Sequence, residues 1–153
     1  MHKTMLALIA GAGAVLGIGI LAWADSTTVD GMWLMAPFGA TAVLIFGVPE
    51  SPLAQPKNVL LGHLIAAFIG ICFSEYAVVA PWSLAVATGL TITIMLLTGT
   101  THPPAGANPM LIMLTGQSWD FLVMPVLAGA VILVLSGYAV KRCRRVIIAA
   151  QIK

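Results

Sequence analysis

Six stretches of this chain are almost free of charged residues, and no other feature restricts its possible folds as strongly. Hydrophobic residues make up 60% of its 153 residues and charged residues only 8%, far below the roughly 25% of soluble domains. A helix that spans a bilayer needs about 20 apolar residues. The pattern therefore predicts an all-α, polytopic integral membrane protein. The apolar runs cover about residues 5–23, 36–48, 59–80, 81–98, 105–115 and 121–140.

Two of these runs, 36–48 and 105–115, are too short to cross a bilayer as simple helices. At about 12 residues and 1.5 Å per residue, each reaches roughly 18 Å against a hydrocarbon core of about 30 Å. We therefore expect a single transmembrane domain over residues 1–153. It should be a helical bundle of four long helices and two short or broken half-helices.

The two short runs begin alike, with Pro37-Phe38-Gly39-Ala40 and Pro104-Ala105-Gly106-Ala107. A glycine, a proline and a second glycine follow each of them in the same order. This likeness predicts two long-short-long repeats, at about residues 5–80 and 81–140. If each short element crosses the bilayer, each repeat has three crossings and the two repeats have opposite orientation. If the short elements are re-entrant, the chain has four spans and the two repeats run parallel. We favour six crossings, because they place Lys57 on the cytoplasmic side.

Basic residues gather at positions 141–145, in a predicted basic cytoplasmic tail at 141–153. Together with Lys3, this cluster places both termini in the cytoplasm by the positive-inside rule. We expect the membrane to be a bacterial inner (plasma) membrane. The cluster is an anchor rather than a surface for nucleic acid, so we expect no nucleic-acid partner. Cys72 and Cys143 lack the spacing of a metal or disulfide site, and we expect no metal and no cofactor.

The first apolar run has two interpretations. Ala22-Trp23-Ala24 before Asp25 resembles the cleavage site of a secretory signal peptide. A retained helix is favoured, because an apolar run of about 19 residues is long for a signal peptide. Gly13 and Gly17 have the spacing of a G-x-x-x-G face, which predicts close packing against another helix.

A polar, proline-broken segment at residues 101–109 separates two apolar runs. A half-helix that starts inside a membrane protein presents unpaired N–H groups and a positive dipole end, both of which favour anions. Pro103 and Pro104 suit its first turn, and Thr101 or His102 could cap it. Two such N-termini facing each other would form a weakly electropositive passage for a small monovalent anion. The alternative for this segment is a tight polar turn between two helices. The His102 imidazole could titrate near neutral pH and couple anion passage to a proton. A capping or interfacial role for His102 is slightly favoured over this coupling.

A second polar connection, residues 50–58, contains two prolines and precedes His63. As a plain surface loop, it would use Asn58 to cap the next helix. As part of a pore mouth, Gln55, Asn58 and His63 would be donors, and Glu50 would pair with Lys57. His63 lies within an apolar run, where a polar side chain should face protein or water rather than lipid.

Four segments together form a specific pattern: residues 37–42, residues 49–59, Gly62-His63, and Thr101-His102-Pro103-Pro104-Ala105-Gly106-Ala107. In this order they resemble the HPP family of integral membrane proteins. The resemblance covers most of the chain, and it implies transport of nitrite or a similar small anion. The candidate substrate-binding residues are Pro37, Gly39, Ala40, Thr41, Gln55, Asn58, His63, Thr101, His102, Pro103, Pro104, Gly106, Ala107 and Asn108.

Three functions compete for such a chain. The favoured one is a transporter or channel for a small monovalent anion, with nitrite as the preferred substrate. Such a protein has the lipid bilayer and its anion substrate as partners. A non-transporting scaffold or assembly protein is the second. A membrane-embedded enzyme is the least favoured, because no nucleophile with a base and no metal-ligand spacing is present, so we expect no catalytic residue. A chain this short should also associate as a homo-oligomer to bury its polar elements.

Overall fold

The computed structural model describes residues 2–28 and 33–151, and this part of the chain contains helices and no strand. The predicted all-helical class is confirmed. Three helical segments, Lys3–Thr27, Pro56–Tyr76 and Leu122–Ile147, are long and apolar enough to span a membrane. The six α-helices are α1 (His2–Thr27), α2 (Ala36–Ala42), α3 (Pro56–Tyr76), α4 (Pro81–Leu97), α5 (Asn108–Thr115) and α6 (Ala128–Gln151).

Four shorter helical pieces extend or connect these helices. The π-helix η1 (Val43–Gly47) continues α2, and the π-helix η4 (Leu122–Leu127) leads into α6. The 3₁₀ turns η2 (Pro52–Ala54) and η3 (Pro103–Ala107) precede α3 and α5.

Prolines mark most helix starts, including the predicted start at Pro103 and Pro104. Proline lies in the first two positions of α2, α3, α4, η3 and α5, where its missing N–H costs nothing. Gly116 ends α5 in the left-handed conformation, with φ of 66°, which glycine adopts without strain.

The predicted basic cytoplasmic tail at 141–153 stays a prediction, and its described part is helical, because α6 continues to Gln151. No glycine or proline follows Gly137, and lysine, arginine and alanine favour helix. The basic cluster therefore lies in the second half of α6, ahead of its last turn.

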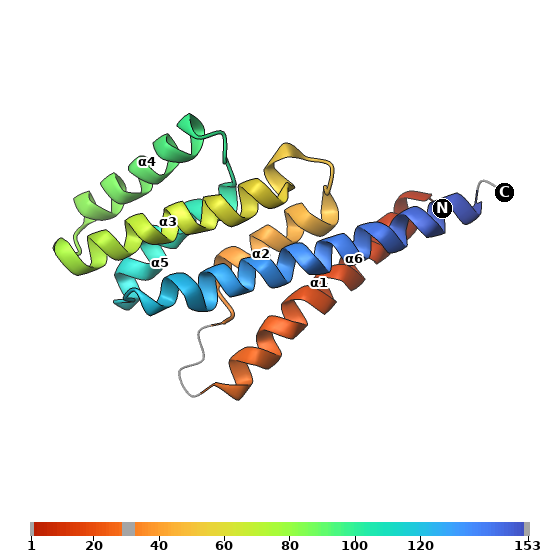
Figure 1. The fold of residues 1–153 in the computed structure, drawn as a ribbon, viewed down its shortest axis with the longest axis horizontal. Helices are drawn as coiled ribbons and strands as arrows, with labels where there is room; N and C mark the ends of the chain where they lie inside the picture. Colours follow the sequence, from red (N-terminus) through yellow and green to blue (C-terminus); the bar gives the residue numbers. More distant parts are fainter. Residues whose placement is uncertain (1, 29–32, 152–153) are drawn as a thin grey trace.

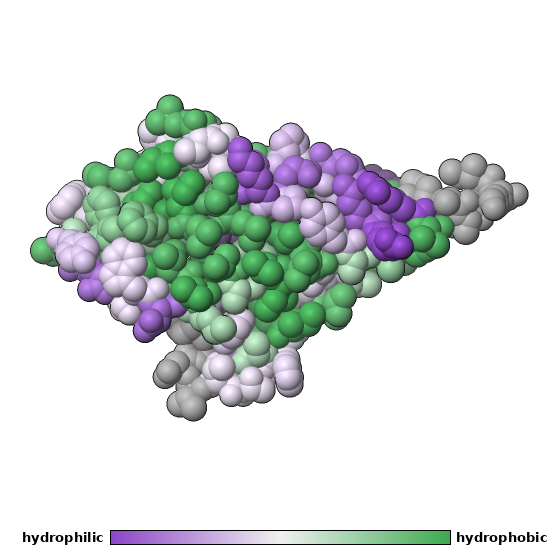
Figure 2. Space-filling model, in the orientation of Figure 1, coloured by the Kyte–Doolittle hydropathy of each residue, from purple (hydrophilic) through white to green (hydrophobic). Residues whose placement is uncertain are grey.

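The long helix α3 lies between α4 and α6, and α1 flanks α6 on the outside (Figure 1). The start of α1 and the end of α6 lie at the same end of the bundle (Figure 1). Figure 2 shows apolar side chains over the middle of the visible face and hydrophilic ones gathered toward that end. This distribution suits a bundle inside a bilayer, with its basic end outside the hydrocarbon.

Two large side chains of the α2–η1 helix lie against glycines of α6. The ring of Phe38 fills the space where a side chain at Gly129 would lie, and Ile45 does the same at Gly137. A side chain at either glycine would collide with its partner. The two contacts fix the position of α2 along α6.

The predicted close packing of the first helix is confirmed. A Cβ at Gly13 would lie 2.7 Å from a ring carbon of Phe46, and a Cβ at Gly17 would lie 3.0 Å from the same ring. The missing side chains allow α1 to approach both Phe46 and the α6 residues Leu133 and Val140.

The connections before α3 and before η3 lie together at the basic end of the bundle. Glu50 pairs with Lys141 of α6 at 3.1 Å, and Asn58 donates a hydrogen bond of 2.9 Å to the carbonyl of Thr101. The expected pairing of Glu50 with Lys57 is therefore wrong. In the fold, Lys141 in the second half of α6 pairs with the glutamate instead.

Candidate functional site

The centre of the candidate site is a group of four polar side chains that are completely shielded from solvent. Thr41 comes from α2, His63 from α3, His102 from the residue before η3, and Asn108 from the start of α5. All four were selected from the sequence as candidate site residues, and the fold brings them together from segments up to 67 positions apart. Polar groups buried in a membrane domain are costly unless they are paired. We call these four residues the histidine relay.

The Thr41 hydroxyl is the hub of the histidine relay. Its Oγ1 lies 2.8 Å from Nε2 of His63 and 2.9 Å from Nε2 of His102. It also lies 3.1 Å from the carbonyl oxygen of Pro37, one helical turn back. The two imidazole rings contact each other edge to face, with centroids 5.0 Å apart.

The outer nitrogens of both rings have partners too. Nδ1 of His102 lies 2.8 Å from the carbonyl oxygen of Leu53. Nδ1 of His63 lies 3.1 Å from Nδ2 of Asn108, which also donates to the His63 carbonyl at 3.3 Å. The relay therefore links α2, α3, η2 and α5 through one continuous set of hydrogen bonds.

These partners fix which nitrogen of each ring carries hydrogen. A carbonyl only accepts, so His102 is protonated on Nδ1 and accepts at Nε2. An amide nitrogen only donates, so His63 accepts at Nδ1 and is protonated on Nε2. The donors then run in one direction, from Asn108 through His63, Thr41 and His102 to the carbonyl of Leu53, and both imidazoles are neutral.

One polar atom of the relay has no partner. The side-chain oxygen Oδ1 of Asn108 is buried and accepts no hydrogen bond. Every N–H and O–H of the relay, by contrast, already has an acceptor. In its neutral form the relay can therefore accept one more hydrogen bond, but it has no free donor.

Two expected capping roles are wrong. Neither Thr101 nor His102 caps η3 with its side chain, because the His102 ring turns toward Thr41 and Leu53. Asn58 does not cap α3, since that helix has no side-chain cap and the Asn58 amide reaches Thr101 instead. Both side chains connect segments that are distant in the sequence.

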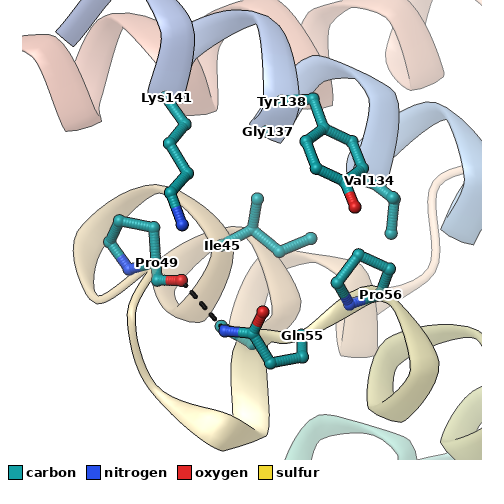
Figure 3. Close-up of a pocket in the computed structure, with 9 residues that line it drawn as sticks. Ile45, Pro49, Gln55, Pro56, Val134, Gly137, Tyr138 and Lys141 are labelled. Carbon is teal, nitrogen blue, oxygen red and sulfur yellow. Dashed lines mark hydrogen bonds between the residues drawn. The ribbon is translucent and has the colours of Figure 1, made fainter. Parts of the chain in front are cut away.

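Gln55 lies away from the relay, at a small pocket beside α6. Its Nε2 donates to the carbonyls of Pro49 and Ser51, at 3.2 Å and 2.9 Å. Lys141 and Tyr138 extend from α6 on the opposite side of this pocket (Figure 3). Neither residue was a candidate for the site, because Lys141 was assigned to the basic anchor and Tyr138 lies in the last apolar run.

An apolar groove lies beside the relay on the outside of the bundle. Both half-helices line it at matching positions, with Pro37 and Ala40 from one and Pro104 and Ala107 from the other. Pro103 is also part of its wall. The remaining lining residues are Ala36, Val43 and Leu44.

The two glycines of these motifs lie differently. Gly39 is exposed and lines a separate groove between α2 and α1. Gly106 is half-buried, and a Cβ at either position would meet no atom within 4 Å. The two half-helices thus meet at one groove through their prolines and alanines rather than through their glycines.

His63 and His102 come together in the fold, which makes a metal site worth testing. Among residues 2–28 and 33–151, no group of three or more histidine, cysteine, aspartate or glutamate side chains could hold an ion. Both inner nitrogens of the histidines already bond the Thr41 hydroxyl. The donor set fits a hydrogen-bond relay better than a metal centre.

Two similar curated proteins are the transmembrane proteins DDB_G0269096 and DDB_G0273707/DDB_G0273361 of Dictyostelium discoideum, with 34% and 31% identity over 139 residues. The matches cover 86% of this chain, and 49% and 45% of the two relatives. The chain thus spans about half the length of the curated relatives it matches. No solved structure matches the chain.

A family model described as the HPP transmembrane region matches residues 1–147. The matched range includes all four members of the histidine relay and both half-helices. The chain is an integral membrane protein that belongs to the HPP family.

Proposed function

We propose that this protein transports a small monovalent anion, with nitrite as the preferred substrate. The observation that carries the proposal is the histidine relay, a shielded polar group in an otherwise apolar bundle, placed where two half-helices meet. Buried polar groups in membrane domains commonly mark substrate or ion pathways. In this proposal the anion crosses without chemical change.

The two half-helices support an inverted repeat. Helix α1, the α2–η1 helix and α3 would form one repeat, and α4, η3 with α5, and α6 the other. The bonds between Asn58 and Thr101, and between Glu50 and Lys141, bring the two connections to the end where α6 finishes. The paired half-helices and the position of these two connections favour six crossings of the membrane. In that topology, Lys57 and His102 lie on the same side of the membrane as the two termini.

The route that we propose follows the apolar groove between the half-helices. Ala40 and Ala107 correspond to each other in the two repeats, and both line this groove. The small size of alanine leaves room for an anion of a few atoms, whereas a larger side chain from either half-helix would narrow the route. The relay adjoins this lining, because Thr41 bonds the carbonyl of Pro37 and His102 lies two residues before Pro104.

The groove opens on the outside of one copy, so a second copy that covers it would separate the route from lipid. We therefore propose a homo-oligomer. We also propose that both termini face the cytoplasm, since Lys3 and the basic end of α6 lie at one end of the bundle. The bacterial plasma membrane stays a prediction from the sequence.

Nitrite uptake into proteoliposomes tests the proposal, with empty liposomes correcting for spontaneous passage of the neutral acid. We expect saturable uptake by the protein and a loss of at least several-fold in the variants Ala40→Leu and Ala107→Leu. Ala85→Leu is the matched control, because Ala85 is exposed on α4. Absence of protein-dependent uptake would refute transport and favour a scaffold. Normal uptake by both groove variants would move the route elsewhere.

A further inference from the structure

We infer that the histidine relay binds one proton on His102, with the Thr41 hydroxyl acting as a switch, and that the anion therefore crosses together with a proton. The second part rests on the proposed function, whereas the first does not. The inference comes from the hydrogen-bond geometry around Thr41, where one hydroxyl hydrogen has two acceptors within reach.

The first step concerns what the neutral relay can bind. All its N–H and O–H groups are engaged, and its one unpaired atom, Oδ1 of Asn108, is an acceptor. An anion needs donors or positive charge. The neutral relay offers neither, so it can attract an anion only after it has gained a proton.

The second step concerns where a proton can be added. In the neutral relay, Nε2 of His102 accepts from the Thr41 hydroxyl. If that hydroxyl turns to the Pro37 carbonyl, 3.1 Å away, Nε2 becomes free to take a proton. The new N–H then donates to Thr41 Oγ1, whose two lone pairs also receive the N–H of His63. Every hydrogen bond is kept, and the ring gains a positive charge.

The same change at His63 is less favourable. Its free lone pair is on Nδ1, which accepts from the amide nitrogen of Asn108. Protonation there would require the Asn108 amide to turn over. That rotation would place Oδ1 against the His63 carbonyl oxygen, which now accepts from Nδ2 at 3.3 Å. The relay is therefore built to accept the proton on His102.

The surroundings of His102 add no competing charge. The His102 ring contacts one titratable side chain, that of His63 on α3. Its other hydrogen-bond partners are the Thr41 hydroxyl on α2 and the Leu53 carbonyl in η2, which carry no charge. Lys57 is exposed, and the carboxylate of Glu50 is exposed and paired with a lysine of α6. Among residues 2–28 and 33–151, no carboxylate forms a hydrogen bond or ion pair with the ring, so a proton on His102 leaves an unbalanced positive charge. An anion entering beside the relay would balance that charge.

Nitrogen-15 NMR of histidine-labelled protein in nanodiscs tests the proton site directly. The chain has three histidines, and His2, at the start of α1, serves as a reference. At alkaline pH we expect hydrogen on Nε2 of His63 and on Nδ1 of His102. On acidification, a proton should appear on Nε2 of His102 while the His63 signals keep their pattern. The opposite tautomers, or protonation at His63 first, would overturn the inference.

Two substitutions of Thr41 test whether its hydroxyl controls proton uptake by His102, and a third substitution controls for the loss of a buried threonine hydroxyl elsewhere. Thr41→Val removes the hydroxyl and should abolish the ordered proton uptake, whereas Thr41→Ser should keep it. Thr91→Val is the matched control, because Thr91 is equally shielded and bonds only the carbonyl one turn back, that of Ala87, at 2.9 Å. If Thr41→Val and wild type protonate alike, the switch does not exist. If Thr41→Val does not fold, the histidine tautomers of the wild type and of Thr41→Ser test the switch. Tautomers opposite to those expected in either protein would refute it.

Proteoliposomes then test the coupling. An acidic outside medium without membrane potential should drive nitrite inward, and an inside-positive potential without a pH gradient should not. Thr91→Val should keep this behaviour, and Thr41→Val should lose most of the pH-driven uptake. Protein-dependent uptake that follows the potential would overturn the coupling and leave transport standing. No uptake would refute the proposed function, while the NMR result would still decide the proton site.

Discussion

The close approach of the Thr100–His102 segment to α3 gives a sharp test of how the relay is positioned. A Cβ at Gly62 would lie 2.8 Å from Cβ of His102 and 3.2 Å from the carbonyl oxygen of Thr100. Neither atom is the flexible end of a side chain. In the Gly62→Ala variant, the whole segment must therefore move away from α3.

The size of this movement follows from the contact. Carbon atoms prefer separations of about 3.5–4.0 Å, so the segment must shift by roughly 0.7–1.2 Å. A shift of that size away from α3 would break the bond of 2.9 Å between Asn58 and Thr101. Overpacking costs about 1–3 kcal/mol and the lost bond about 1 kcal/mol, while alanine in a helix regains up to about 1 kcal/mol. We expect the free energy of unfolding to fall by about 1–4 kcal/mol.

Reversible unfolding in mixed micelles containing SDS, followed by circular dichroism, measures this change. Gly89→Ala is the matched control, because Gly89 lies inside α4 with open space around its missing side chain. This variant should be unchanged, or more stable by up to about 1 kcal/mol. If Gly62→Ala proved as stable as Gly89→Ala, the tight contact between α3 and the His102 segment would be wrong.

Three further substitutions test other contacts by the same unfolding measurement. Phe38→Ala removes a fully buried ring and should cost about 3–5 kcal/mol; a cost below about 1 kcal/mol would contradict its place in the core. Glu50→Gln removes an ion pair whose glutamate side chain is 77% exposed, so the change should stay within about 1 kcal/mol, and a larger loss would show that the pair is more than a surface contact. Asn58→Ala leaves the Thr101 carbonyl without its partner and should cost about 1–3 kcal/mol; an unchanged protein would mean that this bond does not join the two connections.

The fold class could be read from hydropathy because a bilayer imposes long apolar helices. The helix ends were predicted less well. Hydropathy marks where lipid ends rather than where a helix ends, so it missed the basic turns of α6, which remain helical to Gln151. It also gave no sign of the π-helix Val43–Gly47, because that change in hydrogen bonding follows from packing.

The members of the relay could be selected from the sequence, since Thr41, His63, His102 and Asn108 all lie in the specific motifs. Their arrangement could not. His63 was expected at a pore mouth and His102 at a helix cap, whereas both rings converge on one hydroxyl. Local spacing carries no information about contacts between segments 61 positions apart. The Leu53 carbonyl could not be found at all, because a backbone acceptor has no side-chain signal.

The contacts of Phe38 with Gly129 and of Ile45 with Gly137 restrict how the α2–η1 helix can move relative to α6. With both contacts in place, the α2–η1 helix cannot slide along α6 unless two bulky side chains leave their glycines together. These helices should behave as one rigid body. The Phe38 ring also contacts the imidazole of His63, with centroids 5.2 Å apart. A movement that kept both glycine contacts would carry the α2–η1 helix and α6 together, and tilting this body would press on one ring of the relay.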